Sequence, residues 1–419
     1  MNDAIFDPAT ADPYSIPLDQ LNPAQAALFQ ADRHWAYFER LRREAPVHFT
    51  AESEFGPYWS VTKYKDIMAV DTNHQVYSSL STLGGIAIRD QSADFPLPMF
   101  IAMDPPRHDA QRLAVSPIVA PSNLANLEGL IRERAVMILD ALPRGEAFDF
   151  VDRVSIELTT QMLATLFDFP FEERRKLTRW SDVATAVPGG GIVETEEQRQ
   201  AELRECLGYF MNLWNERLKT GGGNDLISML QSSPATREMS PQEFLGNIIL
   251  LIVGGNDTTR NSLTGGVYAF SKFPAEWAKL KANPALLDSA VPEIIRWQTP
   301  LSHMRRTALA DAELGGQQIK KDDKVVMWYV SGNRDEEMIE RPMDLIIDRT
   351  RPRQHLSFGF GFGFGIHRCV GNRLAEMQLK IVWEEILKRG FEIEVLEEPS
   401  RIFSTFIKGY GTMKVKIAA

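Results

Sequence analysis

The sequence predicts a mainly α-helical protein with small β-sheets, folded as a single domain over residues 1–419, with residues 1–20 as an N-terminal arm. Helical patterns of apolar residues dominate from 107 to 219 and return after 240, with the recurrence typical of α-helices. Strand-like segments are few and short, and neither an internal repeat nor a long low-complexity linker divides the chain. With 44% hydrophobic residues, the chain can bury one large core.

The expected elements follow in order along the chain. Residues 23–43 carry an amphipathic helical pattern, and two short strands around a Gly-Pro turn come next, at 47–50 and 58–62. A stretch from 76 to about 100, rich in Gly, Pro and apolar residues, favours a long loop. Glycine runs break the helical region at 188–191 and 221–223. The remaining expected elements are a helix after residue 240, a helix around 293, strands near 324–330, a last helix from about 371, and strand and turn at 403–416.

Composition excludes several classes of protein. The net charge of −10 argues against a nucleic-acid partner, which would require a basic surface. The longest apolar run, 248–253, is far shorter than the ~20 residues of a membrane span. The N-terminus lacks a basic and apolar signal region, so we expect a cytoplasmic protein. Two cysteines, Cys206 and Cys369, form neither a disulfide framework nor a zinc pair.

Cys369 lies between a glycine-rich loop and a predicted helix. Residues 362–371 read Phe-Gly-Phe-Gly-Ile-His-Arg-Cys-Val-Gly. The backbone N–H groups and the positive end of a helix that begins near Gly371 are expected to lower the pKa of the thiol. A thiolate held in this way suits a soft or borderline metal. Taken alone, a buried cysteine is more often a structural residue than a ligand, and only the full ten-residue spacing favours the ligand; a phosphate-binding loop is excluded because G-x-G-x-x-G is absent.

A second informative segment is the helix after residue 240. Ser240 predicts the N-cap, and Glu243 completes a capping box. Two glycines follow in the helix interior, each costing about 1 kcal/mol relative to alanine. Gly254 lies four residues before Thr258 on the same face, which opens a groove beside the hydroxyl. We expect that hydroxyl to donate back to the carbonyl of Gly254.

The ten-residue spacing around Cys369 resembles the haem-ligand loop of the cytochrome P450 family. The likeness covers nearly the whole chain, and it is greatest to the bacterial soluble alkane and fatty-acid hydroxylase branch, through segments 55–64, 99–112 and 367–383. It implies the triangular helical P450 fold, haem b (iron protoporphyrin IX) as cofactor and Cys369 as the axial ligand of the iron, with Phe362 and Gly363 in the haem-binding loop. Phe-Gly occurs four times in 358–365, whereas the family motif needs two copies, so the loop is expected to carry an extension.

The same resemblance assigns roles to further residues. Asp257 and Thr258 match the acid–alcohol pair that delivers protons during oxygen activation. Haem propionates need cationic donors, and four residues match the family's: His108, Arg112, Arg306 and His367. A shift of one residue in this match would replace Arg306 by Arg305.

Glu293 and Arg296 stand at i and i+3 on one helical face and resemble the structural Glu-x-x-Arg pair of the family. The alternative is an exposed pair that contributes little, roughly 0–1 kcal/mol. Family members usually add a third basic residue downstream. The matching position here is Asp344, so an incomplete triad is expected.

An apolar substrate pocket is predicted around these residues. An apolar wall suits an apolar ligand, although each wall residue could equally be core packing. The predicted substrate contacts are Ile88, Leu97, Leu250, Gly254, Leu301, Met304 and Phe406.

The resemblance implies a monooxygenase that inserts one oxygen atom of O2 into the terminal carbon of medium-chain alkanes or fatty acids. A ferredoxin and its reductase would supply electrons, because the chain carries no flavin, nicotinamide or iron–sulfur motif. Arg107, Arg368 and Arg373 are candidates to meet an acidic ferredoxin. The alternatives are another apolar substrate such as a terpenoid or steroid, a peroxygenase or isomerase, and a non-enzymatic haem sensor.

Overall fold

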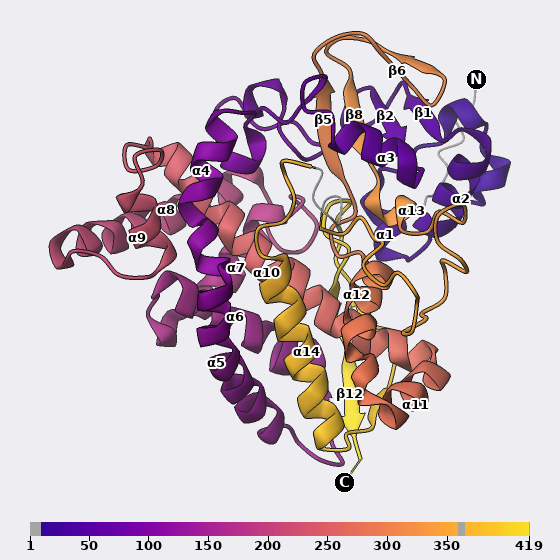
Figure 1. Ribbon diagram of the computed structural model, residues 1–419. Coiled ribbons are helices and arrows are strands. Elements are labelled where there is room, and N and C mark those ends of the chain that lie inside the picture. Colours follow the sequence, from indigo (N-terminus) through magenta and orange to yellow (C-terminus); the bar gives the residue numbers. More distant parts are fainter. Residues whose placement is uncertain (1–9, 359–364, 419) are drawn as a thin grey trace.

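The computed structural model describes residues 10–358 and 365–418. Helices make up most of this part, and the largest sheet lies at one corner of a wedge-shaped molecule, beside the N-terminus (Figure 1). The helices are α1 (Ala26–Gln30), α2 (His34–Glu44), α3 (Tyr64–Asp71), α4 (Arg107–Val115), α5 (Pro121–Asp140), α6 (Glu157–Phe167), α7 (Arg175–Thr185), α8 (Glu196–Thr220), α9 (Leu226–Ser232), α10 (Pro241–Lys272), α11 (Pro274–Ala282), α12 (Leu287–Gln298), α13 (Tyr329–Gly332) and α14 (Asn372–Lys388). The predicted fold class is confirmed.

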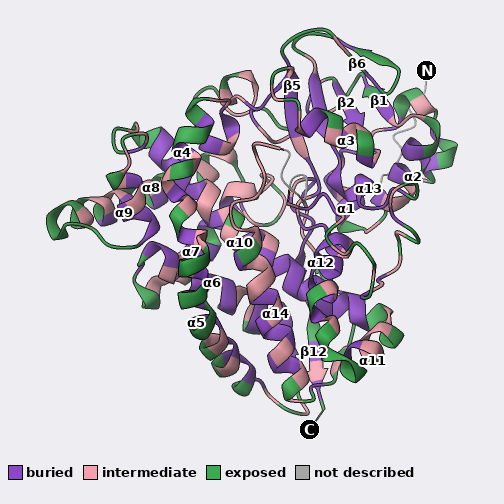
Figure 2. Cartoon of the chain, in the orientation of Figure 1, coloured by how far each residue is buried: buried purple, intermediate pink, exposed green. Residues whose placement is uncertain are grey.

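Helix α10 is the central element of the core. It packs against α6, α7, α12 and α14, and buried residues concentrate where these helices meet (Figure 2). The Ser240 hydroxyl accepts a hydrogen bond from the Glu243 N–H at 3.2 Å, which confirms the predicted N-cap. At Gly265 and Gly266 an added Cβ would lie 2.5 Å from the Gln298 side chain and 2.8 Å from that of Trp383. These two glycines therefore allow α12 and α14 to pack closely on α10.

The sheets are small. The largest has the strand order β1-β2-β8-β5-β3, with a parallel β2/β8 pair and antiparallel neighbours elsewhere. A second sheet has the order β4-β12-β9, and two further pairs are β6/β7 and β10/β11. The strands are β1 (Val47–Thr50), β2 (Tyr58–Val61), β3 (Tyr77–Ser78), β4 (Ala147–Asp149), β5 (Met304–Ala308), β6 (Ala312–Leu314), β7 (Gln317–Ile319), β8 (Lys324–Met327), β9 (Ile393–Val395), β10 (Ser400–Arg401), β11 (Tyr410–Thr412) and β12 (Lys414–Ile417).

Two local predictions differ from the structure. The helix expected over 23–43 is divided into α1 and α2, because Asp32 adopts a left-handed conformation with φ of 56°, which a right-handed helix cannot continue. The loop expected from residue 76 begins instead with β3, which pairs with β5. The partner strand β5 was not predicted either. It contains the adjacent charged residues Arg305 and Arg306, which conceal the alternation of apolar and polar residues typical of a strand.

The N-terminal arm is attached to α2 where the structure describes it. The Arg40 guanidinium donates to the carbonyl oxygens of Pro13 and, at 2.6 Å, of Ile16. Within the described residues, no helix has both the length and the apolar character needed to cross a bilayer.

Candidate active site

A cavity of about 440 Å³ lies between α10 and the start of α14. Thr258 lines it from α10, and Cys369 lines it from the residues just before α14. The seven residues predicted to contact substrate all lie on its wall: Ile88, Leu97, Leu250, Gly254, Leu301, Met304 and Phe406. Segments far apart in the sequence therefore meet around one apolar space.

The Cys369 thiol is held at the N-terminus of α14. Its backbone N–H donates to the Phe358 carbonyl at 2.8 Å, and the N–H groups of Gly371 and Asn372 are directed at the sulfur. Burial raises the pKa of the Cys369 thiol, and it outweighs these N–H groups and the positive charge of Arg112. The predicted lowering of this pKa is therefore wrong for the protein alone, because desolvation dominates. A coordinating metal deprotonates such a thiol outright.

Two imidazoles lie on the same wall, that of His108 buried and that of His367 partly buried. His108 and His367 pack edge to face with ring centroids 4.4 Å apart. His108 Nδ1 is 2.7 Å from an Asp109 carboxylate oxygen, and His367 Nε2 is 3.0 Å from the Ser79 hydroxyl. Among the described residues, the other ring nitrogens, His108 Nε2 and His367 Nδ1, have no hydrogen-bond partner. Burial lowers the pKa of both rings.

Two of the arginines on the wall, Arg306 and Arg112, were predicted to bind propionates. Arg306 lines the cavity and pairs with Asp71 at 2.8 Å. Arg305 pairs with Asp90 and is absent from the cavity wall, as expected because successive strand residues point to opposite faces. Of the two arginines, Arg306 is therefore the one whose side chain is placed to bind a propionate. Arg112 also lines the cavity and donates to the Arg368 carbonyl.

These groups suit haem. The wall offers the Cys369 thiol for the iron, and its basic side chains include the four predicted to bind the two propionates: His108, Arg112, Arg306 and His367. The unpartnered imidazole nitrogens can bond to carboxylates, and guanidinium groups bind them with charge-assisted hydrogen bonds. Phe362 and Gly363, also predicted to bind haem, lie outside the described residues.

Helix α10 brings a hydroxyl to the cavity. Thr258 Oγ1 donates to the Gly254 carbonyl at 3.1 Å, as predicted. Asp257, one residue earlier and about 100° around the helix, is absent from the wall. It is fully buried and pairs with Arg260 at 2.8 Å, and Arg260 also bonds to Asp182 of α7 at 2.9 Å.

Asp257 is an unusual carboxyl group. Burial raises its pKa to about 6, although the Arg260 charge opposes the shift. Among the described residues, its Oδ2 atom has no hydrogen-bond partner. Because the folded-state pKa lies above the ordinary value, ionisation of Asp257 reduces stability as the pH rises from about 4 to 6. A group that exchanges its proton near neutral pH suits a proton relay.

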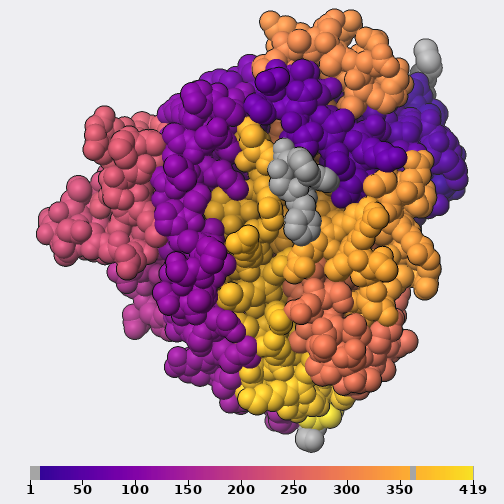
Figure 3. Space-filling view, viewed as in Figure 1, coloured from indigo at the N-terminus to yellow at the C-terminus, as the bar shows by residue number. Residues whose placement is uncertain are grey.

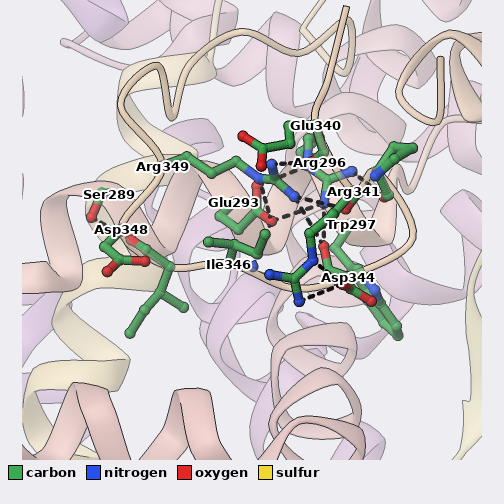
Figure 4. Close-up of polar contacts among 12 residues, drawn as sticks. Ser289, Glu293, Arg296, Trp297, Glu340, Arg341, Asp344, Ile346, Asp348 and Arg349 are labelled. Carbon is green, nitrogen blue, oxygen red and sulfur yellow. Dashed lines mark hydrogen bonds and ion pairs between the residues drawn. The ribbon is translucent and has the colours of Figure 1, made fainter. Parts of the chain in front are cut away.

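The structural pair becomes a buried triad (Figure 4). Arg296 donates twice to Glu293, with both distances 2.8 Å. Arg349 donates to the same carboxylate at 2.9 Å. The third basic residue is thus Arg349, and the match to Asp344 was wrong by five positions. Asp344 instead contributes its backbone carbonyl, 2.8 Å from Arg296 Nη2.

Sequence reasoning missed the residues that support the site. Ser79 bonds to His367, Asp71 to Arg306, and Arg260 to Asp257. The first two contacts join residues 288 and 235 positions apart, so no local pattern could reveal them. Arg260 was detectable, since it stands three residues after Asp257 on one helical face.

A mainly helical fold whose cavity holds a thiol, cationic partners for two carboxylates and a helix hydroxyl defines a haem-thiolate protein. Residues 192–417 match the family model described as Cytochrome P450. The chain belongs to the cytochrome P450 family, so its cofactor is haem b and it is a monooxygenase, an oxidoreductase. The predicted family, fold and cofactor are confirmed.

Three similar proteins illustrate this membership. Linalool 8-monooxygenase of Pseudomonas putida is 35% identical over 90% of this chain and 94% of its own. Methyl-branched lipid omega-hydroxylase of Mycobacterium bovis is 31% identical over 90% of each chain. The structure of CYP153D17 from Sphingomonas sp. PAMC 26605 is 48% identical and superposes with a TM-score of 0.88, covering 96% of this chain and 100% of the other.

Proposed function

We propose that this monooxygenase hydroxylates the terminal carbon of medium-chain alkanes or fatty acids. The observation that carries the proposal is the apolar wall, on which residues from separate segments meet beside Thr258 and Cys369. The sequence likeness to alkane and fatty-acid hydroxylases supports it, as does the relative named as a lipid omega-hydroxylase, since omega denotes the methyl end of a chain. When bound, haem supplies the activation of O2.

The residues of this chain would bind and orient the substrate. Each Å² of apolar surface removed from water contributes about 25 cal/mol, so a long hydrocarbon gains affinity along the whole wall. Holding the methyl end near Thr258, on the α10 side of the cavity, would place one C–H bond in position to react. We propose that Cys369 holds the iron, that His108, Arg112, Arg306 and His367 bind the propionates, and that Glu293 and Arg296 support the fold.

Product analysis with a panel of substrates tests the function. With NADH, a ferredoxin and its reductase, we expect terminal alcohols from medium-chain alkanes and fatty acids as the main products, with little product from peroxide alone. Linalool belongs in the panel because one relative is named for its oxidation. Preferred oxidation of linalool or a steroid would replace the proposed substrate, and turnover with peroxide only would favour a peroxygenase. No oxidation of any compound would favour a haem sensor.

We further propose that Thr258 and Asp257 move protons toward the cavity, with the Thr258 hydroxyl as the group that lines it. In Thr258→Ala, we expect the fraction of electrons recovered in product to fall at least about tenfold, since positioned proton donors contribute 10²–10⁴-fold. NADH consumption should continue and release hydrogen peroxide. Thr258→Ser, which keeps the hydroxyl, is the matched control; unchanged coupling in the alanine variant would remove Thr258 from the relay.

Gly254 has a different role from the packing glycines of α10. A Cβ added there meets no heavy atom within 4 Å, so the residue leaves room in the cavity rather than allowing close packing. We expect Gly254→Ala to stabilise the helix by about 1 kcal/mol while it lowers turnover of the bulkiest substrates. Gly265→Ala is the control and should destabilise the protein, because its Cβ would collide with Gln298. Thermal unfolding and product profiles measure the two effects.

We also propose that a ferredoxin, reduced by its reductase, docks on the face that carries α14, the yellow-orange segment at the centre of Figure 3. Arg373 is exposed in the first turn of α14. Arg107 is also exposed but pairs with Glu243 at 2.7 Å, and Arg368 lies on the cavity wall. Arg373 is therefore the best candidate, and a raised KM for ferredoxin in Arg373→Glu is the check. The single domain and the cytoplasmic location stay predictions.

A further inference from the structure

A second cavity, of about 250 Å³, lies apart from the haem site. Residues 404–407 line the large cavity and residues 408–410 line this one, so one segment borders both. Aromatic side chains from α2, from α10, from the residue that joins α10 to α11, from α12 and from β11 form much of its wall. They are Trp35, Tyr268, Phe273, Trp297 and Tyr410.

Two buried cations also line this cavity. Lys408 is 9% exposed and Arg334 is 2% exposed. Lys408 Nζ donates to the Gln298 carbonyl at 2.8 Å, and Arg334 donates to the Trp297 carbonyl at 2.6 Å. Arg334 Nε has no hydrogen-bond partner, and neither cation has a carboxylate within 4.0 Å, where the structure describes the chain. Buried charges are normally paired, so Lys408 and Arg334 lack a neighbouring negative charge among the described residues.

The acidic groups nearby are already engaged. Asp32, the carboxylate on the wall, accepts hydrogen bonds from Trp35 at 2.9 Å and from Arg401 at 3.1 Å. Glu398 bonds to Arg401 at 2.6 Å. Burial, together with the charges of Arg334 and Arg401, lowers the pKa of Lys408 to about 7, although Asp32 opposes the shift. Both observations indicate that a bound anion would be stabilised here.

We propose that this cavity binds a small organic carboxylate with a flat apolar body. The carboxylate would lie against Lys408 and Arg334, and the body would lie against the aromatic wall that includes Trp35 and Trp297. These rings already face the cations: the Arg334 guanidinium lies 4.7 Å from the Trp35 ring centre and 5.9 Å from that of Trp297. The volume is below the roughly 300–1,000 Å³ of typical ligand pockets, which limits the ligand to about one ring.

Isothermal titration calorimetry, with benzoate added to the haem-loaded protein, tests the proposal. We expect one site per chain, no change in the haem Soret spectrum, and binding that persists when a saturating alkane fills the large cavity. Benzamide, the uncharged analogue, and acetate, which lacks the ring, should bind at least about tenfold more weakly, since charge-assisted hydrogen bonds and aromatic contacts supply the affinity. Equal binding of benzamide would overturn the proposal, as would displacement of benzoate by alkane.

Lys408→Met is the decisive variant. It keeps an unbranched apolar stem and removes the charge, and because that charge is unpaired the variant should remain folded. We expect it to weaken benzoate binding at least about tenfold, and Trp35→Leu to weaken it as well. Lys380→Met, at a partly exposed lysine of α14 that pairs with Asp288 at 2.7 Å, should bind benzoate like the parent protein. Unchanged affinity in Lys408→Met would overturn the proposal, whatever the substrate panel shows about hydroxylation.

Discussion

Replacing Cys369 by alanine is expected to abolish the red-shifted Soret band that the reduced protein gives with carbon monoxide, and to reduce hydroxylation to background. The thiol is the group on the cavity wall that can bind iron as a thiolate, and two backbone N–H groups are directed at its sulfur. Thiolate ligation supplies the electron density that favours O–O cleavage, and the alanine methyl group cannot replace it. Carbon monoxide difference spectra and product assays measure both losses.

Cys206→Ala is the matched control for this prediction. Cys206 is fully buried in α8 and is absent from the cavity wall. Its removal leaves a small void, which costs stability but leaves the iron ligand in place. We expect the variant to keep the red-shifted band and its activity. A Cys369→Ala protein that binds haem and still shows this band would contradict the assignment of the ligand.

Short-range features of the site could be predicted because each depends on residues close in the sequence. The N-cap of α10 involves Ser240 and Glu243, three positions apart, and the bond from Thr258 to the Gly254 carbonyl spans four. A ten-residue motif likewise contains Cys369 and Gly371, the N-cap residue of α14. Such contacts follow from helix geometry, whatever the rest of the chain does.

Long-range support could not be predicted, because it depends on how distant elements pack. The choice between Arg305 and Arg306 is decided by which face of β5 meets the cavity, and that face is set by pairing with β8 and β3. The direction of the Cys369 pKa shift is another case. Helix geometry alone predicts a lowered pKa, but the burial that raises it arises only when the whole cavity is assembled.

The triad of Glu293, Arg296 and Arg349 is a further contact that could be predicted only in part. Glu293 and Arg296 share a helix, so their contact follows from spacing. Arg349 reaches Glu293 through an irregular segment after α13, where residue counts do not determine position. The carboxylate of Glu293 also accepts the Ile346 N–H at 2.9 Å, so this segment folds around it. The third partner is therefore set by the path of the backbone rather than by a fixed offset.

Replacing Glu293 by glutamine is expected to lower the free energy of unfolding by about 3–5 kcal/mol, the loss typical of removing one partner from a buried ion pair. Glu293 is fully buried, and the change leaves the guanidinium groups of Arg296 and Arg349 without their shared carboxylate. Burial raises the pKa of Glu293, but hydrogen bonds from Arg296 more than offset it, so the pKa lies below its ordinary value. The stabilisation is therefore present above about pH 4 and is lost as the pH falls further.

Urea unfolding of the haem-loaded proteins at pH 7 and at acid pH measures this effect. The difference in the free energy of unfolding between Glu293→Gln and the parent protein should be smaller at the lower pH. Arg349→Met should cost less than Glu293→Gln, because it leaves the two-bond Arg296–Glu293 contact intact. Asp288→Asn, which removes an exposed partner of Lys380, should change stability by no more than about 1 kcal/mol. If Glu293→Gln lowered the free energy of unfolding no more than Asp288→Asn does, the triad would not be the contact that holds residues 340–349 against α12.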